Sequence, residues 1–355
     1  MRPTRILLLH AETEENRTLS YQRGWPREFE RHPRFRTVSG VARLGRRLSS
    51  PRIDAVVMLH SVLSNDLILD ESVLRRLERL SVPKAYFIGN EYKLMPQKMA
   101  FCERVGVDLL VSHLSSERAL DLYRARLGCT VVAIPNTGVD PAWFRPERPS
   151  AERPVDLGYR AYDSPLYLGH QERRELAERF LEVAGRLGLA VDISLDPADR
   201  FGERDWAAFL NRCKGQLGTE AGGDYFELGD ETRNAVNSFL RDHPGAGFSE
   251  VWDRFFARYQ HPVSGRALSG RIVEAAATKT VQILLEGEYG GYFRPDVHYI
   301  PLRKDFSNLD EAVAKFRDPE LGCAVAERAY EVAIGELTYA ALIDRFARAL
   351  EPLLG

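Results

Sequence analysis

The segment with the clearest chemical character in this 355-residue chain is residues 271–282. It reads as a short helix followed by a strand, with Glu274 near the helix start and three alanines directly after it. A carboxylate among apolar neighbours needs hydrogen-bond partners, and a pair of ribose hydroxyls would supply them. A carboxylate that only stabilises the start of a helix would look the same. We predict that Glu274 binds a ligand, with Thr278 and Lys279 beside it.

Two further segments could hold an anion or a polar ligand. Arg160 ends an apolar run at 155–159, and its guanidinium can make paired hydrogen bonds to a phosphate. Residues 218–223 follow another short run, where Glu220 could accept hydroxyl groups and Gly222 would let the backbone approach a ligand closely. The alternatives are a surface ion pair for Arg160 and an ordinary turn for 218–223. We predict that Arg160, Glu220 and Gly222 belong to the same site as Glu274.

Titratable groups also follow the apolar runs in the first half of the chain. Histidines end three of these runs and a polar loop ends another. A histidine or a loop at such a place is often only structural. Because the ends of parallel strands meet at one edge of a sheet, these groups could instead share a second binding site. Its candidate residues are His10, His60, Asn90, Glu91, Tyr92, Lys93 and His113.

Several common catalytic motifs do not occur in the sequence. The first apolar run leads into residues 10–13, HAET, rather than into a GxGxxG turn, and there is no GxxxxGK[ST] loop or GxSxG elbow. These absences disfavour dehydrogenases, P-loop kinases and α/β-hydrolases. No Asp-x-Asp pair, HExxH motif or histidine cluster suggests a bound metal, and the cysteines form no CxxC pair. We therefore expect no metal ion and no cofactor.

The elements that must position these residues alternate along the first half of the chain. Short, continuously apolar runs fit strands that are covered on both faces, and the stretches between them fit helices. Such alternation predicts a parallel sheet with crossover helices. Strands are expected at 6–9, 55–59, 85–88, 109–112 and 131–134, and helices at 67–80, 96–105 and 116–127.

A turn-rich, proline-rich stretch from 135 to 154 divides the chain into two halves. A second α/β series follows, interrupted by an aromatic-rich insertion at about 224–270. Its strands are expected at 155–159, 190–194, 215–218, 281–285 and 297–300, and its helices at 172–187, 205–213, 309–316, 319–335 and 339–354. We predict an α/β fold with two doubly wound, Rossmann-like domains, 1–148 and 149–336, that face each other across a cleft. We expect a C-terminal helix in 337–355 to pack back on the first domain.

Composition narrows the classes of partner. The chain carries 49 Lys and Arg against 51 Asp and Glu, which argues against nucleic-acid binding and against a polybasic membrane anchor. No apolar run approaches the ~20 residues of a membrane span, and the basic, apolar start reads as a strand rather than a signal peptide. Widely spaced cysteines suit a reducing cytoplasm. The sequence does not indicate an oligomeric state.

The linker and the second half resemble a known family. Residues 135–146, PNTGVDPAWFRP, resemble the segment that closes the first domain of GT-B glycosyltransferases. Residues 274–280, EAAATKT, resemble a segment of the retaining group-1 enzymes, and the run from Glu274 to Asn308 is similar to the CgeB-type glycosyltransferase-like proteins. The resemblance implies metal-independent transfer of a sugar from a nucleotide-sugar donor to an acceptor hydroxyl, with retention of configuration.

The resemblance also implies roles for single residues. The second domain would hold the donor and the first domain the acceptor. Glu274 matches the family's ribose-binding carboxylate, and Arg160 resembles a basic residue that contacts phosphate. The family has another glutamate eight positions before Glu274, where this chain has Arg266. Glu220 is the candidate replacement for that glutamate, which contacts the donor sugar.

Two alternatives remain open from the sequence. If the reaction inverted the configuration of the sugar, His10, His60 or Glu91 would serve as the general base. The other alternative is a protein that keeps the GT-B fold and binds a nucleotide or a sugar without catalysis. The arginine at position 266 favours this second alternative.

Overall fold

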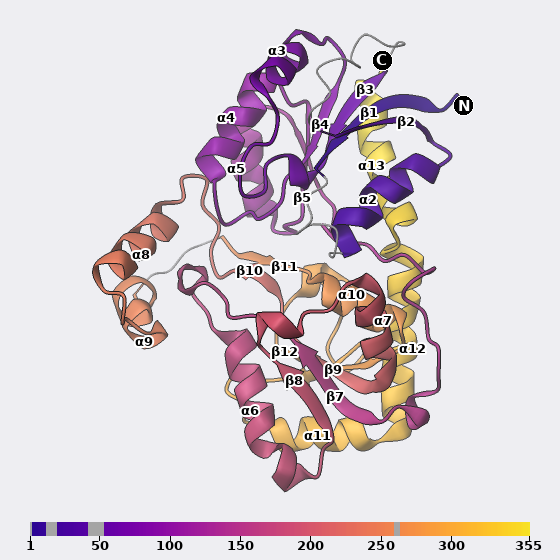
Figure 1. Cartoon of the computed structure of the whole chain (residues 1–355), viewed down its shortest axis with the longest axis vertical. Helices are drawn as coiled ribbons and strands as arrows, with labels where there is room; N and C mark the ends of the chain where they lie inside the picture. Colours follow the sequence, from indigo (N-terminus) through magenta and orange to yellow (C-terminus); the bar gives the residue numbers. More distant parts are fainter. Residues whose placement is uncertain (1, 12–19, 42–52, 259–262) are drawn as a thin grey trace.

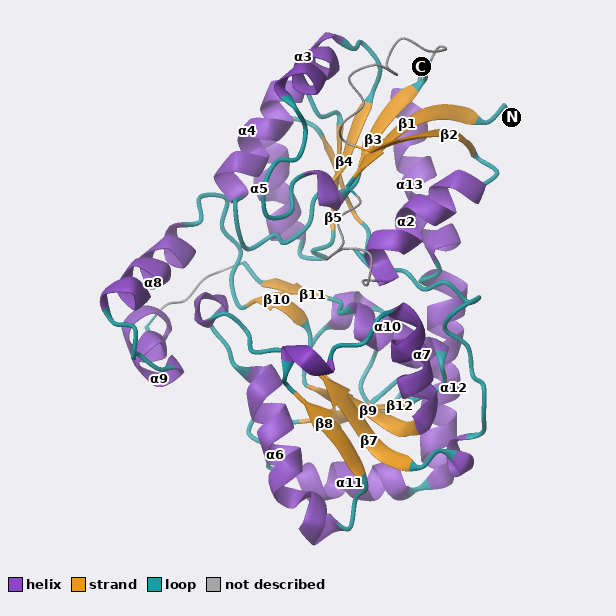
Figure 2. Ribbon diagram, viewed as in Figure 1, coloured by secondary structure: helices purple, strands orange, loops and turns teal. Residues whose placement is uncertain are grey.

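The protein folds into two α/β domains, stacked one above the other in Figure 1, each built on a parallel sheet. This computed structural model describes residues 2–11, 20–41, 53–258 and 263–355. Figure 2 shows the sheets as separate layers, with helices on both faces of each. The predicted α/β class with two Rossmann-like domains is therefore confirmed.

The sheet of the first domain has the strand order β2-β1-β3-β4-β5-β6, with every neighbouring pair parallel. The strands are β1 (Thr4–His10), β2 (Phe35–Val41), β3 (Ala55–Met58), β4 (Lys84–Phe87), β5 (Leu109–Ser112) and β6 (Thr130–Ala133). The helices are α2 (Ser20–Arg31), α3 (Glu71–Arg79), α4 (Met95–Val105) and α5 (Glu117–Leu127). The edge strand β2 was not predicted, because its sequence mixes polar and apolar residues and Val38 on it stays 42% exposed.

The sheet of the second domain has the order β13-β12-β9-β7-β8 and is also parallel. The strands are β7 (Val155–Arg160), β8 (Val191–Ser194), β9 (Cys213–Gly218), β12 (Val281–Leu285) and β13 (Ile300–Leu302). The helices are α6 (Glu172–Leu187), α7 (Glu203–Arg212), α10 (Gly270–Ala277), α11 (Leu309–Arg317) and α12 (Pro319–Glu336). These elements lie within a few residues of the predicted ones.

An insertion projects from the second domain between the short antiparallel strands β10 (Ala221–Gly223) and β11 (Gly265–Ala267). It contains α8 (Glu231–Asp242), which was not predicted, and α9 (Phe248–Val251), which continues into a π-helical turn at Trp252–Phe256. Figure 1 shows α8 and α9 standing to one side of both domains. A small apolar cluster of its own, including Val236, Phe239 and Val251, supports this insertion.

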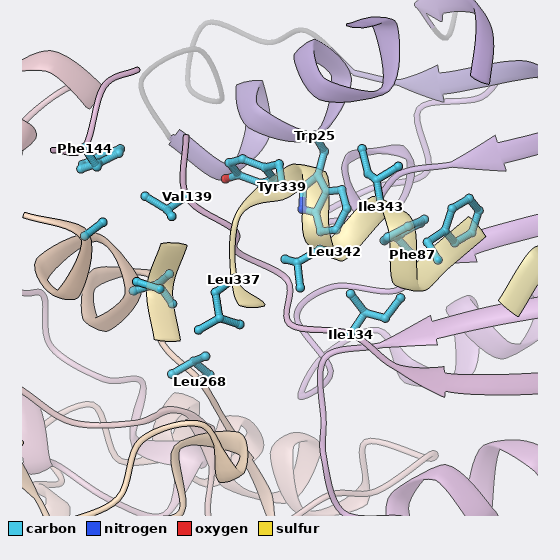
Figure 3. Packing of buried hydrophobic residues seen from close by; sticks show 14 of the residues in the cluster. Trp25, Phe87, Ile134, Val139, Phe144, Leu268, Leu337, Tyr339, Leu342 and Ile343 are labelled. Atoms are coloured by element: carbon cyan, nitrogen blue, oxygen red, sulfur yellow. The ribbon is translucent and has the colours of Figure 1, made fainter. Parts of the chain in front are cut away.

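The chain crosses between the domains twice, and the two crossings are bonded to each other. Val139 donates its N–H to Leu337 O (2.8 Å), and Tyr339 donates to Val139 O (3.2 Å). The second crossing leads into α13 (Tyr339–Leu350), which packs against α2 of the first domain. Figure 3 shows Tyr339 beside Trp25, and the two ring centroids are 5.4 Å apart.

Phe346 on α13 supports a prediction about stability. Its side chain is fully buried, with its ring 5.0 Å from Phe87 and 5.6 Å from Phe29 in the core of the first domain. Phe346→Ala should lower the free energy of unfolding by ~3–5 kcal/mol in chemical denaturation, the cost of removing a buried phenyl group. Leu181→Ala, at a position 52% exposed, is the control. Equal losses for the two variants would contradict docking of α13.

Candidate functional site at the domain interface

The carboxyl edges of the two sheets face each other across the domain interface. Leu114, two residues after β5, forms a β-bridge with Ala267 at the end of β11. At the start of α10, a Cβ added to Gly270 would lie 2.6 Å from a side-chain carbon of Thr137 in the linker. Loops that follow parallel strands are where ligands of such sheets bind. The residues predicted from strand ends therefore lie around one interface.

Glu274 lies on α10, close to this interface. Its side chain is almost fully buried, and Trp206 Nε1 on α7 donates a hydrogen bond of 2.8 Å to its Oε2. Helix α10 begins at the carboxyl edge of the sheet and returns to the amino edge, where β12 starts. Glu274 is thus fixed in orientation by an indole group from the neighbouring helix, a partner that the sequence did not reveal.

Three arginines gather around the ring of Tyr162, two residues after β7. The guanidinium carbons of Arg173, Arg200 and Arg271 lie 4.6, 5.0 and 6.0 Å from the ring centroid. Burial raises the pKa of the Tyr162 phenol, but these arginines outweigh burial and bring the pKa below its ordinary value. Within the described residues, none of the three forms an ion pair with a carboxylate. Positive charge is thus concentrated around this ring, and the Glu274 carboxylate is the negative charge that acts on Arg271.

Arg173 is the most enclosed of these arginines. It lies at the start of α6, only 6% of its surface is exposed, and its Nη1 has no hydrogen-bond partner among the described residues. Burial and the neighbouring Arg173 lower the pKa of Arg271. An anion would stabilise the buried Arg173 guanidinium and the neighbouring guanidinium that it repels. A phosphate or diphosphate group fits this description.

Arg160, which is predicted to contact phosphate, has its side-chain partner on the neighbouring strand. Its Nη1 donates to Asp192 O (2.8 Å) and its Nη2 to Asp192 Oδ1 (2.5 Å) on the adjacent strand β8. The guanidinium also lies over the ring of Phe209, 4.6 Å from the centroid. The sequence located the correct edge of the sheet, but the partner on β8 turns this side chain toward itself. Arg173 and Arg271 are further candidates for binding an anion.

A compact ionic network surrounds position 266. Arg266 makes two hydrogen bonds to Glu172, of 2.7 and 2.8 Å, and Lys304 Nζ lies 2.8 Å from the same carboxylate. Thr219 Oγ1 donates to it as well. Burial would raise the pKa of Glu172, but Arg266, His170 and Lys304 lower it to about 2. The charge of Arg266 is therefore neutralised within the protein.

Glu220 remains as a buried carboxylate at the end of β9. Its Oε1 accepts a hydrogen bond from Tyr289 N (2.8 Å), and burial raises its pKa. Its other oxygen, Oε2, would lie 2.6 Å from a Cβ added to Gly287, so this glycine leaves the space that the carboxylate occupies. Glu220 thus lies at the carboxyl edge of the sheet, and its contact with ligand hydroxyls stays a prediction.

The structure gives contacts within the protein to three residues that are predicted to bind a ligand, Gly222, Thr278 and Lys279. Gly222 has φ of 85°, and a Cβ there would lie 2.0 Å from Gly265 O, so it shapes the β10–β11 pair. Thr278 is fully buried and donates to carbonyls of its own helix. Lys279 Nζ lies 2.6 Å from Glu327. Both follow the last residue of α10, one helix length away from the interface.

A cavity of about 740 Å³ lies at this opposite, amino edge of the second sheet. Lys279, Lys214 and Arg153 line it, together with the linker and the start of α12. Arg153 is buried there and donates to Cys213 O (3.0 Å) and Thr278 O (2.7 Å), close to the carboxyl ends of α7 and α10. Its role is to attach the linker to the second domain.

On the side of the first domain, Glu91 and His113 form a pair. Glu91 is buried and accepts hydrogen bonds from Ser112 Oγ (2.8 Å), His113 N (2.8 Å) and Tyr123 OH (2.5 Å). His113 Nδ1 lies 2.8 Å from Glu91 Oε1, and the His113 side chain is 12% exposed. Burial would raise the pKa of Glu91, but His113 and Tyr123 bring it below its ordinary value. An ionised, fixed carboxylate thus sets the orientation of the imidazole.

The other predicted histidines are buried. His10 Nε2 lies 3.1 Å from Ser39 Oγ. His60 packs under Gly89, and burial together with His113 lowers the pKa of His60 to about 3. A histidine with so low a pKa is a weak base near neutral pH. Of the three predicted bases, His10, His60 and Glu91, none is more than 5% exposed.

The polar loop at 90–93 does reach the interface. The ring of Tyr92 lies 6.4 Å from that of Tyr167 in the second domain. Asn90 Nδ2 donates to Ser64 Oγ (3.0 Å), and Lys93 Nζ donates to Asn65 Oδ1 (2.5 Å). The side chain of Tyr92 thus makes a contact across the interface.

In the described ranges, no group of three or more His, Cys, Asp and Glu side chains could hold a metal ion. Among the helices that the structure describes, none combines the length and the apolarity that crossing a membrane would require.

The fold is that of the GT-B glycosyltransferases. Similar solved structures include sucrose-phosphate synthase from Thermosynechococcus elongatus, with a TM-score of 0.51, 11% identity and 99% of both chains covered. HepE from Anabaena has a TM-score of 0.50 and 10% identity, and the match covers 99% of this chain and 100% of HepE. AviGT4 has a TM-score of 0.51 and 14% identity, and the match covers 99% of this chain and 98% of AviGT4. No protein-family model matches the sequence, and no curated protein matches it.

Proposed function

We propose that this protein transfers a sugar from a nucleotide-sugar donor to an acceptor hydroxyl, without a metal ion. The observation that carries the proposal is the pair of guanidinium groups, Arg173 and Arg271, at the carboxyl edge of the second sheet. Fixed positive charges at this place would stabilise the nucleoside diphosphate as it leaves, the task that a divalent ion performs in other enzymes. The GT-B fold supports the same reading.

The donor would lie along the second domain. Glu274 would accept hydrogen bonds from the ribose, since Trp206 holds its carboxylate in place. Arg173 and Arg271 would bind the diphosphate, and Glu220 would accept hydroxyls of the sugar. HepE has been solved in complex with UDP and glucose, which supports a donor of this chemical class.

The acceptor would approach from the first domain, near His113 and Tyr92. We propose retention of configuration, as the CgeB-type resemblance implies, so that the leaving phosphate takes the acceptor proton and no strong base is needed. His113, held by Glu91, would then orient the acceptor hydroxyl. In an inverting reaction the same imidazole would be the base, and NMR of the product anomer distinguishes the two outcomes.

Glu274→Ala tests the ribose contact. The variant should weaken binding of the nucleotide by ~1–3 kcal/mol in calorimetry, because hydrogen bonds to the ligand hydroxyls are lost. Glu327→Ala removes a half-exposed carboxylate at the opposite edge of the same domain and should leave affinity unchanged. Unchanged affinity in Glu274→Ala would exclude the ribose role.

A panel of nucleoside diphosphates and nucleotide sugars, screened by thermal shift and then by transfer assays, tests the proposal as a whole. Stabilisation by one base series, followed by release of nucleoside diphosphate in the presence of EDTA, is expected. A second candidate function is binding without catalysis, which the neutralised Arg266 favours, since the family's sugar-contacting carboxylate is absent there. Tight binding with no turnover on any acceptor would support that second candidate.

A further inference from the structure

The insertion of the second domain is anchored in the first domain. Phe226, three residues after β10, is buried, and its ring lies 5.1 Å from that of Tyr123 on α5. Phe226 N donates to Val263 O (3.0 Å), and both residues belong to the apolar core cluster of the first domain. The domains are therefore joined at the insertion as well as at the two chain crossings.

Asp230 extends this anchor to helix α4. Met95, the first residue of α4, donates its N–H to Asp230 Oδ1 (3.3 Å), while Leu94, the residue at the cap position, makes no side-chain cap bond. The second oxygen of Asp230 pairs with Arg233 at 3.3 Å, and Asp230 is 5% exposed. The start of a helix of the first domain is thus capped by a carboxylate of the second domain.

Lys98, one turn into the same helix, holds the loop that precedes it. Its ammonium group is fully buried and donates to three backbone carbonyls, those of Gly89 (2.6 Å), Asn90 (2.8 Å) and Lys93 (2.8 Å). An ammonium group has three N–H donors, so these bonds use all of them. The loop needs such support, because Asn90 and Leu94 adopt left-handed backbone conformations, with φ of 47° and 55°.

We propose that Lys98 and Asp230 are positioning residues for the transfer reaction proposed above. Lys98 fixes the loop from Gly89 to Lys93, and with it the Glu91 carboxylate that orients His113. Asp230 fixes the start of α4, which carries Lys98, and it does so from the second domain. The geometry of the acceptor side therefore depends on the insertion being seated, and a separated first domain would hold His113 less firmly.

Two variants with matched controls test this proposal. Lys98→Met keeps a long apolar stem and removes the three donors, and Lys84→Met alters another buried lysine, at the start of β4. Asp230→Ala removes the cap, and Asp242→Ala removes an exposed carboxylate at the end of the same α8. Each variant is measured by hydrogen–deuterium exchange of residues 89–94, by kcat and by calorimetric donor affinity.

Lys98→Met should exchange faster at 89–94 and lose ~100-fold in kcat, with donor affinity unchanged, because a displacement of about 1 Å at a reacting group can cost this much. Asp230→Ala should also speed exchange at 89–94 and lower kcat, both by less than Lys98→Met does. If Lys98→Met fails to fold, Asp230→Ala alone tests the proposal. Wild-type protection in the loop, or faster exchange with unchanged kcat, would overturn the proposal. If the wild-type protein transfers no sugar, the proposed function fails, and exchange alone then decides whether Lys98 fixes the loop.

Discussion

Arg173→Ala is expected to weaken binding of a nucleoside diphosphate by ~10- to 100-fold, with little change in binding of the nucleoside. Arg173 is buried beside Arg271, and hydrogen bonds from a charged donor to a phosphate contribute ~1.5–3 kcal/mol each. Since only the diphosphate carries the negative charge, the loss should appear in that ligand alone. Calorimetry with the two ligands measures the difference directly.

The neighbouring residue provides the control for this prediction. The Arg174 side chain is 42% exposed and pairs with Asp163 and Glu178, so Arg174→Ala should leave both affinities unchanged. Arg160→Ala should lower the thermal stability without a selective loss of diphosphate binding, because its partner is Asp192. A selective loss in Arg160→Ala, with none in Arg173→Ala, would return the phosphate role to Arg160.

His113→Ala is expected to lower kcat by ~100-fold or more while the donor still binds normally. The imidazole is held by Glu91 at the end of β5, and a fixed group that orients or deprotonates a hydroxyl contributes at least this much. Glu91→Gln should give a smaller loss, since the amide can still contact Ser112 but no longer carries the negative charge that holds the imidazole. Steady-state kinetics and donor affinity together separate the two steps.

His243→Ala, at the exposed end of α8, is the control for this second prediction. It should leave kcat unchanged, because its ring stacks on Phe239 and its Nδ1 lies 3.1 Å from Phe239 O, at the far end of the insertion. A kcat of His113→Ala equal to that of the wild type would remove the histidine from the reaction, and a parallel loss of donor affinity would place it on the donor instead.

Much of the fold could be predicted, because strands that are buried on both faces have continuously apolar sequences. Ile6, Leu8 and Val57 are fully buried in the first sheet, and their runs are apolar without interruption. The edge strand β2 was not predicted, since one of its sides is solvated and its sequence mixes polar and apolar residues. Helix α8 was not predicted, because its apolar residues pack in a small local cluster.

The site was predicted less completely, because the sequence does not show in which direction a side chain points. The rule on strand ends identifies an edge of the sheet, but it does not say which way a side chain turns. Arg160 meets Asp192 on the next strand, and Lys279 lies at the far end of α10. Arg271 was within the segment already singled out, three positions before Glu274, and its place at the helix start was the available signal. Lys98 gave no signal, because a lysine inside a helix is usually solvated.

We propose that this protein transfers a sugar without a metal ion, and one measurement tests this proposal most directly. Nucleotide sugars are incubated with the protein in EDTA, with and without candidate acceptor alcohols, and release of nucleoside diphosphate is followed over time. We predict acceptor-dependent release that persists in EDTA and falls sharply in Arg173→Ala and His113→Ala. Release that requires added Mg²⁺ or Mn²⁺, or donor binding with no release on any acceptor, would contradict the claim.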